Sequence, residues 1–129
     1  GSVHFVFRME VLARENLYLN TLFGSGTNIG SGEDSIFILS AIRKGLKVRT
    51  NKSLIAKVYN DNSNWFEGYN EKYFYDKGVL ARALFPRLYK LYIRYFLYSH
   101  PEMLREIKKE KAKEKMLEGA KDFGGYNGK

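Results

Sequence analysis

The chain has 129 residues, of which 44% are hydrophobic and 16% aromatic, and its formal net charge is +8. This length supports one domain with a hydrophobic core, and the hydrophobic content excludes wholesale disorder. The chain has no cysteine, which excludes disulfides, thiolate zinc sites and cysteine nucleophiles, and no apolar run reaches the roughly 18 residues of a membrane span.

The first half of the chain predicts strands alternating with helices. Aromatic and β-branched residues over 3–8 are typical of a strand, and partial periodicity over 9–19 indicates a short helix. Alternating side chains over 46–50 and an apolar run over 54–59 predict two further strands. We therefore expect an α/β fold, in which a small mixed sheet carries flanking helices.

A glycine-rich loop separates the short helix from the next one. Four glycines over 24–32 precede Glu33 and Asp34, and the apolar residues that follow predict a buried helix. Ser31 and Asp34 have the spacing of a capping box, so Ser31 or its neighbour Gly32 is expected to cap this helix. Gly45 is typical of the residue just past a helix end.

The character of the chain changes from about Lys77. The segment 80–98 predicts a helix interrupted at Pro86, and 102–122 predicts a charged helix with Glu at every fourth position and Lys or Arg three residues after most of them. We expect residues 3–78 to form one unit and 79–129 to form a helical extension, first amphipathic and then charged.

The glycine-rich loop does not match the common phosphate-binding patterns. A P-loop ends in Gly-Lys-Ser/Thr, whereas this loop ends in Gly32-Glu33-Asp34, and the glycine spacing differs from the dinucleotide fingerprint. Two carboxylates at the start of a helix would also repel a phosphate. The sequence therefore argues against nucleotide binding by this loop alone.

Two interpretations of Glu33 and Asp34 remain open from the residues alone. As ordinary acidic residues in a first helical turn they would each contribute about 0.3–1 kcal/mol through the helix dipole. As ionised carboxylates beside a flexible loop they could instead act in general-base catalysis.

The order of motifs along the chain resembles the C-terminal, acceptor-side half of family 2 glycosyltransferases of the GT-A class, of the bacterial polysaccharide-synthesis type. The resemblance covers roughly residues 3–98. Its motifs are Phe23-Gly24-x-Gly26, then Gly32-Glu33-Asp34-Ser35-x-Phe37, then Lys44-Gly45-Leu46-Lys47-Val48, and the aromatic segment Trp65 to Gly78.

The resemblance implies an inverting transfer of a sugar from a nucleotide-sugar donor to a saccharide or lipid-linked acceptor. Asp34 would remove the proton from the acceptor hydroxyl, and Glu33 would hydrogen-bond the acceptor. The backbone of Gly30, Ser31 and Gly32 would approach the acceptor sugar. Three aromatic residues could stack on its ring or simply pack in a core or an interface, namely Trp65, Phe66 and Tyr69.

The sequence departs from the family pattern at two places. No Asp-x-Asp metal motif occurs, so we expect the chain to be a fragment without the nucleotide-binding half, inactive alone and free of cofactors. A divalent metal, Mg or Mn, is expected only in the full-length parent. Tyr59 stands where many relatives place a metal-binding His; Asn60 or Asp61 could substitute, or could merely form a turn.

The helix after Pro86 is expected to place Arg87, Lys90 and Arg94 on one side and Leu88, Leu91, Tyr92, Tyr95 and Phe96 on the other. This basic and aromatic helix, 86–98, has two interpretations. It could dock on an anionic membrane, or it could pack against the missing half or a second subunit. The membrane interpretation suits a cytoplasmic enzyme at the inner face of the membrane. A homodimer across an exposed strand edge is a further expectation.

The alternative function is that of a non-enzymatic basic module that binds a membrane surface or nucleic acid. Its C-terminal lysines alternate with glutamates, which argues against nucleic acid.

Overall fold

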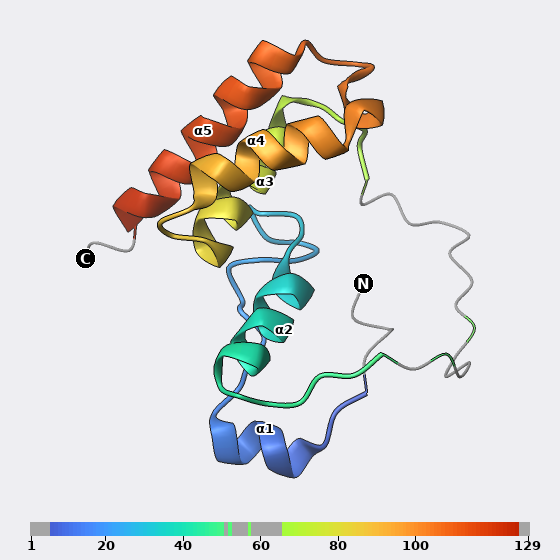
Figure 1. Cartoon of the computed structure of the whole chain (residues 1–129), viewed down its shortest axis with the longest axis vertical. Coiled ribbons are helices and arrows are strands. Elements are labelled where there is room, and N and C mark those ends of the chain that lie inside the picture. Colours follow the sequence, from blue (N-terminus) through green and yellow to red (C-terminus); the bar gives the residue numbers. More distant parts are fainter. Residues whose placement is uncertain (1–5, 51, 53–56, 58–65, 127–129) are drawn as a thin grey trace.

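The computed structural model describes residues 6–50, 52, 57 and 66–126. Helices account for 60% of these residues. Figure 1 shows two levels, with α3 (Glu71–Leu84), α4 (Tyr89–Ser99) and α5 (Lys109–Tyr126) together above, and α2 (Glu33–Arg43) and then α1 (Met9–Glu15) below. A short 3-10 turn, η2 (Pro101–Leu104), follows α4.

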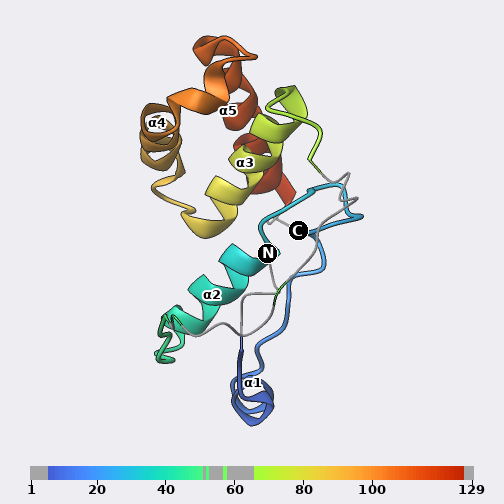
Figure 2. The same cartoon turned by 90° about the vertical axis from the view of Figure 1, so that its right-hand side faces the viewer.

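The upper level is a three-helix body in which α3 and α5 are in close contact. A Cβ atom on Gly78 of α3 would overlap the carbonyl of Met116, and one on Gly119 of α5 would overlap the carbonyl of Tyr75. Glycine at both positions therefore lets the two backbones touch. In the view of Figure 2, α4 lies beside α3 and α5 and completes the three-helix body.

The core of this body is formed by one face of each of its helices. Phe74, Ile93 and Met116 are fully buried, one from each of α3, α4 and α5. Pro86 ends the helical run between α3 and α4 because proline has no N–H to donate and clashes with the preceding turn. The predicted interruption at Pro86 is confirmed.

The lower level is attached to the body by a second, smaller core. Phe23 from the glycine-rich loop, Leu39 from α2 and Leu80 from α3 pack in this cluster. The guanidinium of Arg43, at the end of α2, donates a hydrogen bond to the carbonyl of Leu84, at the end of α3. Both contacts hold α2 under α3.

The predicted α/β fold with a mixed sheet is wrong for the described residues. The described part of the first predicted strand, 6–8, and the whole of the second, 46–50, have no strand structure, while most of 54–59 lies outside the described residues. Within the described residues, Phe23 and Ile29 form an isolated β-bridge, and no sheet is formed.

The physical reason is that a strand needs a partner to satisfy its backbone groups. Residues 47–50 alternate in sequence, but they are exposed and no neighbouring strand is described beside them. The strand edge on which the expected dimer depended is therefore not seen in the described chain.

Several predicted helix boundaries are confirmed, and some are shifted. α2 begins at Glu33, and Gly45 follows it with a φ of 77°. Gly32, and no side chain, caps α2, so the predicted capping box does not form. The charged helix starts at Lys109, later than expected, because η2 occupies the preceding segment. The predicted boundary between 78 and 79 falls inside α3.

Candidate functional site

A hollow of about 670 Å³ lies between the glycine-rich loop and the first half of α3. Its walls come from two segments about 40 residues apart in the chain. The lining residues are Ser25, Gly26, Thr27, Gly30 and Ser31 from the loop, and Phe66, Glu67, Gly68, Tyr69, Asn70, Lys72, Tyr73, Asp76 and Lys77 from the α3 side.

The loop wall keeps its shape through internal hydrogen bonds. The Gly24 N–H donates to the Ile29 carbonyl at 2.9 Å, and the Thr27 N–H donates to the Gly24 carbonyl at 3.1 Å. Thr27 Oγ1 lies 3.0 Å from the Gly24 carbonyl and accepts from the Ile29 N–H at 3.2 Å. Gly24 has a φ of 118°, which favours glycine at that turn.

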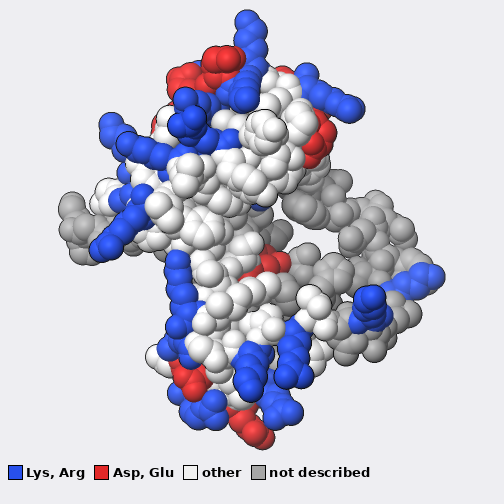
Figure 3. Space-filling model, viewed as in Figure 1, with Lys and Arg blue, Asp and Glu red and all other residues white. Residues whose placement is uncertain are grey.

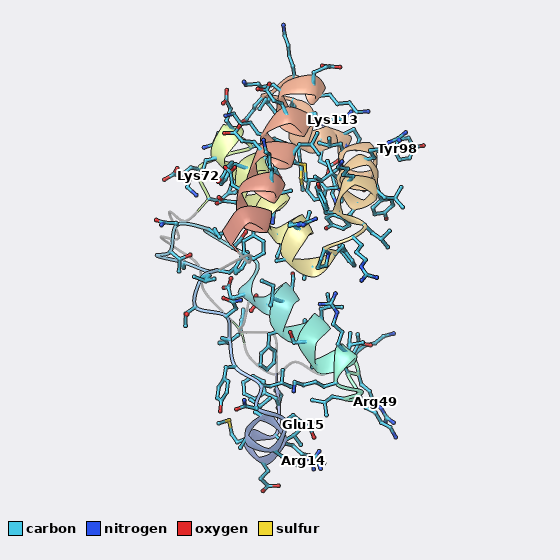
Figure 4. The ribbon with its side chains drawn as sticks, turned by 90° about the vertical axis from the view of Figure 1, so that its left-hand side faces the viewer. Arg14, Glu15, Arg49, Lys72, Tyr98 and Lys113 are labelled. Atoms are coloured by element: carbon cyan, nitrogen blue, oxygen red, sulfur yellow. The ribbon has the colours of Figure 1, made fainter. Side chains whose placement is uncertain are left out.

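Asp76 and Lys72 fasten the loop to α3. Asp76 Oδ2 accepts from the Gly30 N–H at 3.1 Å and from Lys72 Nζ at 2.7 Å. Lys72 Nζ also donates to the Asn28 carbonyl at 2.9 Å. Figure 4 labels Lys72 on the side of α3 that lies toward the loop. We call Asp76 and Lys72 the loop clamp, because together they hold residues 28–30 in place.

The carboxylate of the loop clamp is buried, whereas its lysine is exposed. Asp76 is 8% exposed, and its Oδ1 is buried without a hydrogen bond to any described residue. A buried carboxylate is costly unless it is compensated. Lys72 supplies a direct ion pair, and the ammonium of Lys77 interacts with Asp76 through its charge.

Lys77 brings a second, more sheltered amine to the wall. Burial lowers the pKa of Lys77, while the charges of Asp76 and Glu33 partly oppose that shift. Its Nζ lies 3.5 Å from Ser31 Oγ, at the limit of a hydrogen bond. The lining of the hollow therefore includes two carboxylates, Glu67 and Asp76, and two amines, Lys72 and Lys77. These groups can donate and accept hydrogen bonds and so suit a neutral polyol.

Three aromatic rings also line the α3 side of the hollow. Phe66, Tyr69 and Tyr73 pack edge to face, with ring centroids 5.0 to 6.0 Å apart. Burial, and then the neighbouring Tyr69, raise the pKa of Tyr73 to about 12. Asn70 caps α3 beside these rings by accepting a hydrogen bond from the Tyr73 N–H.

The structure brings three of the predicted acceptor-binding residues to the lining of one hollow. Gly30, Ser31 and Tyr69 all line the hollow. Gly32 lies behind it, where its φ of 119° and the proximity of Leu80 leave no room for a side chain. Trp65 and Tyr59 lie outside the described residues.

The two predicted catalytic carboxylates begin α2 but do not line the hollow. The Glu33 carboxyl group lies against Gly24, where a Cβ atom would meet Glu33 Cδ at 3.1 Å. Asp34 is half-buried, and its Oδ1 is sequestered from solvent. Asp76 is the aspartate that reaches the wall. The catalytic role of Asp34 stays a prediction.

The loop clamp was not singled out from the sequence. Lys72 and Asp76 are four residues apart, which is the spacing of an ion pair on a helix surface. This spacing could have predicted the ion pair between Lys72 and Asp76 from the sequence. The contact of Asp76 with Gly30 spans 46 residues and had no signal in the pattern.

Comparison with known proteins returned no match among family models, curated proteins or solved structures. Within the described residues, no helix has the length and apolar character needed to cross a bilayer. The same residues contain no group of three His, Cys, Asp or Glu placed to hold a metal ion.

Proposed function

We propose that this chain is the acceptor-side part of an inverting glycosyltransferase, and that the hollow binds the saccharide end of the acceptor. The support from the sequence is the ordered set of motifs between residues 23 and 78. The support from the structure is that two of those motifs, far apart in the chain, meet at one hollow.

The observation that carries the proposal is the meeting of Gly30 and Ser31 with Tyr69 and Asn70. A sugar ring has an apolar face and a rim of hydroxyls. The Tyr69 ring offers an apolar plane, while Asn70 and the loop backbone offer hydrogen-bonding groups beside it. This combination of one flat apolar surface and several polar groups suits a saccharide.

The chemical step follows from the predicted roles. Asp34 takes the proton of an acceptor hydroxyl, and the oxygen forms a bond to the anomeric carbon of the donor. The bond from that carbon to the nucleoside diphosphate breaks on the opposite face, so the configuration inverts. Because Asp34 does not line the hollow here, its side chain has to rotate toward Ser31 for this step.

Acceptor binding is tested on the chain itself with bacterial capsular oligosaccharides as probes. Saturation-transfer NMR should show contacts from sugar protons, and Tyr69→Ala should weaken binding at least tenfold because the stacking surface is lost. Tyr98→Ala is the matched control, since this tyrosine is 81% exposed on α4 and far from the hollow lining. An unchanged oligosaccharide affinity in Tyr69→Ala would contradict the proposed site.

The catalytic assignment is tested in a form of the protein that transfers sugar from a nucleotide donor. Asp34→Asn should lower the transfer rate by about 10²–10⁴, the usual worth of a general base, with little change in donor affinity. Glu33→Gln is the neighbouring control and should lower the transfer rate far less. Transfer at the full rate by Asp34→Asn would remove this residue from the mechanism.

A further inference from the structure

Helix α4 turns a stripe of large apolar side chains outward. Its inner face is buried in the three-helix core through Ile93, Phe96 and Leu97. The outer stripe recurs at intervals of three and four residues, which places it along one side of the helix. Its members are 61%, 64%, 63% and 81% exposed, in the order Leu88, Leu91, Tyr95 and Tyr98.

Three exposed cations run along one flank of this stripe: Arg87, Lys90 and Arg94. None of the three forms a salt bridge within the part of the chain that the structure describes. The sequence has no acidic residue between Asp76 and Glu102, so nothing on α4 offsets this charge. Figure 3 shows uncharged surface bordered by Lys and Arg where α4 lies in Figure 1.

The arrangement refines the one expected from the sequence. Tyr92 and Phe96 were expected on the apolar side, opposite the cations. In the structure Tyr92 is half-buried and Phe96 is buried, so both serve the protein core. The outward stripe borders the cations instead of lying opposite to them.

We propose that α4 docks this molecule on an anionic lipid surface. A lipid surface offers hydrocarbon beneath a layer of negative charge, which matches an apolar stripe with cations along its edge. Two of the four stripe residues are tyrosines, whose rings and hydroxyls suit the boundary between hydrocarbon and water. This inference does not depend on the proposed sugar transfer.

A second copy of the chain fits this surface less well. In a twofold contact the same patch meets itself, so Arg87, Lys90 and Arg94 would come close to their own counterparts. The 11 residues of α4 and the preceding Leu88 present only four stripe side chains, whereas a stable dimer buries at least about 1,000 Å². Charge and size therefore both favour the lipid surface.

The test is flotation of the whole chain with vesicles of phosphatidylcholine alone and of phosphatidylcholine mixed with phosphatidylglycerol. We expect binding to the anionic vesicles only, and weaker binding at high salt. Replacing Arg87, Lys90 and Arg94 by Gln should lower the partition coefficient roughly a hundredfold, at about fivefold per cation. Leu91→Gln should weaken binding as well, because the stripe is interrupted.

Matched controls separate this surface from the overall charge. Lys108, Lys109 and Lys113 are exposed at or near the start of α5, and their replacement by Gln removes the same charge elsewhere. Leu22→Gln removes an exposed leucine (52%) from the segment before the glycine-rich loop, outside α4. Both controls should float much more strongly than the corresponding α4 variants.

Three results would overturn the proposal. The first is the absence of binding to anionic vesicles, and the second is an equal loss in the α4 and α5 triple variants, which would indicate charge alone. The third is a dimer in sedimentation that Leu91→Gln dissociates, which would assign the stripe to a second copy. Circular dichroism of each variant checks that the helices remain formed.

Discussion

The three-helix body and the region of residues 6–50 differ sharply in how well they bury their side chains. The body has fully buried residues from each of its helices, such as Phe74 and Met116. The N-terminal region has no described apolar side chain buried to that degree, and large apolar side chains are exposed along it: Val6, Phe7, Met9, Tyr18, Leu19 and Leu22. Regions with less buried apolar contact open at lower free energy.

The hollow lies at the border between these two regions. Its α3 wall belongs to the well-packed body, whereas its loop wall belongs to the less buried region and is held by the loop clamp. The α3 wall is therefore held by the core of the body, whereas the loop wall depends on its own hydrogen bonds and on the loop clamp.

The largest expected effect is that of Phe74→Ala. Removing a fully buried phenylalanine should cost about 3–5 kcal/mol of unfolding free energy, measured by urea denaturation. Phe37→Ala, in the small core of α2, should cost clearly less because its surroundings are more open. Equal losses at the two positions would show that the regions do not differ in packing energy.

Gly78→Ala should come next, because it forces α3 away from α5. The added methyl group would overlap backbone atoms of Met116, and overpacking of this kind costs about 1–3 kcal/mol. Gly125→Ala is the control, since its Cβ would meet nothing within 4 Å. A stable Gly78→Ala variant would mean that the contact between the two helices is looser than described.

A smaller effect is expected from Asp76→Asn. The change removes the ion pair with Lys72 but leaves an acceptor for the Gly30 N–H, so the loss should be about 1 kcal/mol. Hydrogen exchange of the Gly30 amide should accelerate, while exchange in the core of α5 should change little. Unchanged exchange at Gly30 would show that the loop does not depend on the loop clamp.

The smallest effect at neutral pH is that of Tyr73→Phe, which concerns alkaline stability. Because the fold raises the pKa of Tyr73 to about 12 from 10.0, it favours the protonated phenol. The contribution of the protonated Tyr73 to the free energy of unfolding is fully present below pH 10 and is lost as pH rises through about 12. Tyr73→Phe should flatten this fall in thermal stability; an identical alkaline profile in both proteins would contradict the assignment.

Local signals in the sequence were enough to locate several helix ends. The acidic pair at Glu33 marks the start of α2, Gly45 follows its end, and Pro86 separates α3 from α4. Each of these depends on the conformational preference of one or two residues. The part of the candidate site that came from the same kind of signal is the glycine-rich loop with Gly30 and Ser31.

The strands show where such signals were insufficient. Alternation over 46–50 is compatible with a strand, but a strand forms only when a partner lies beside it, and the described residues place none there. The beginning of α3 was missed for the opposite reason. Its aromatic residues are no stronger than average helix formers, and burial of Phe74 in the body stabilises them there.

By itself the sequence determined the net positive charge, the glycine-rich loop, the acidic start of α2 and the acid-free stretch that contains α4. These are properties of composition and of neighbours along the chain. Only the tertiary structure decided that Asp76 meets Gly30, that Tyr69 faces the loop, and which side of α4 remains exposed. Those contacts depend on how helices pack in space, and packing joins residues that have no fixed separation in sequence.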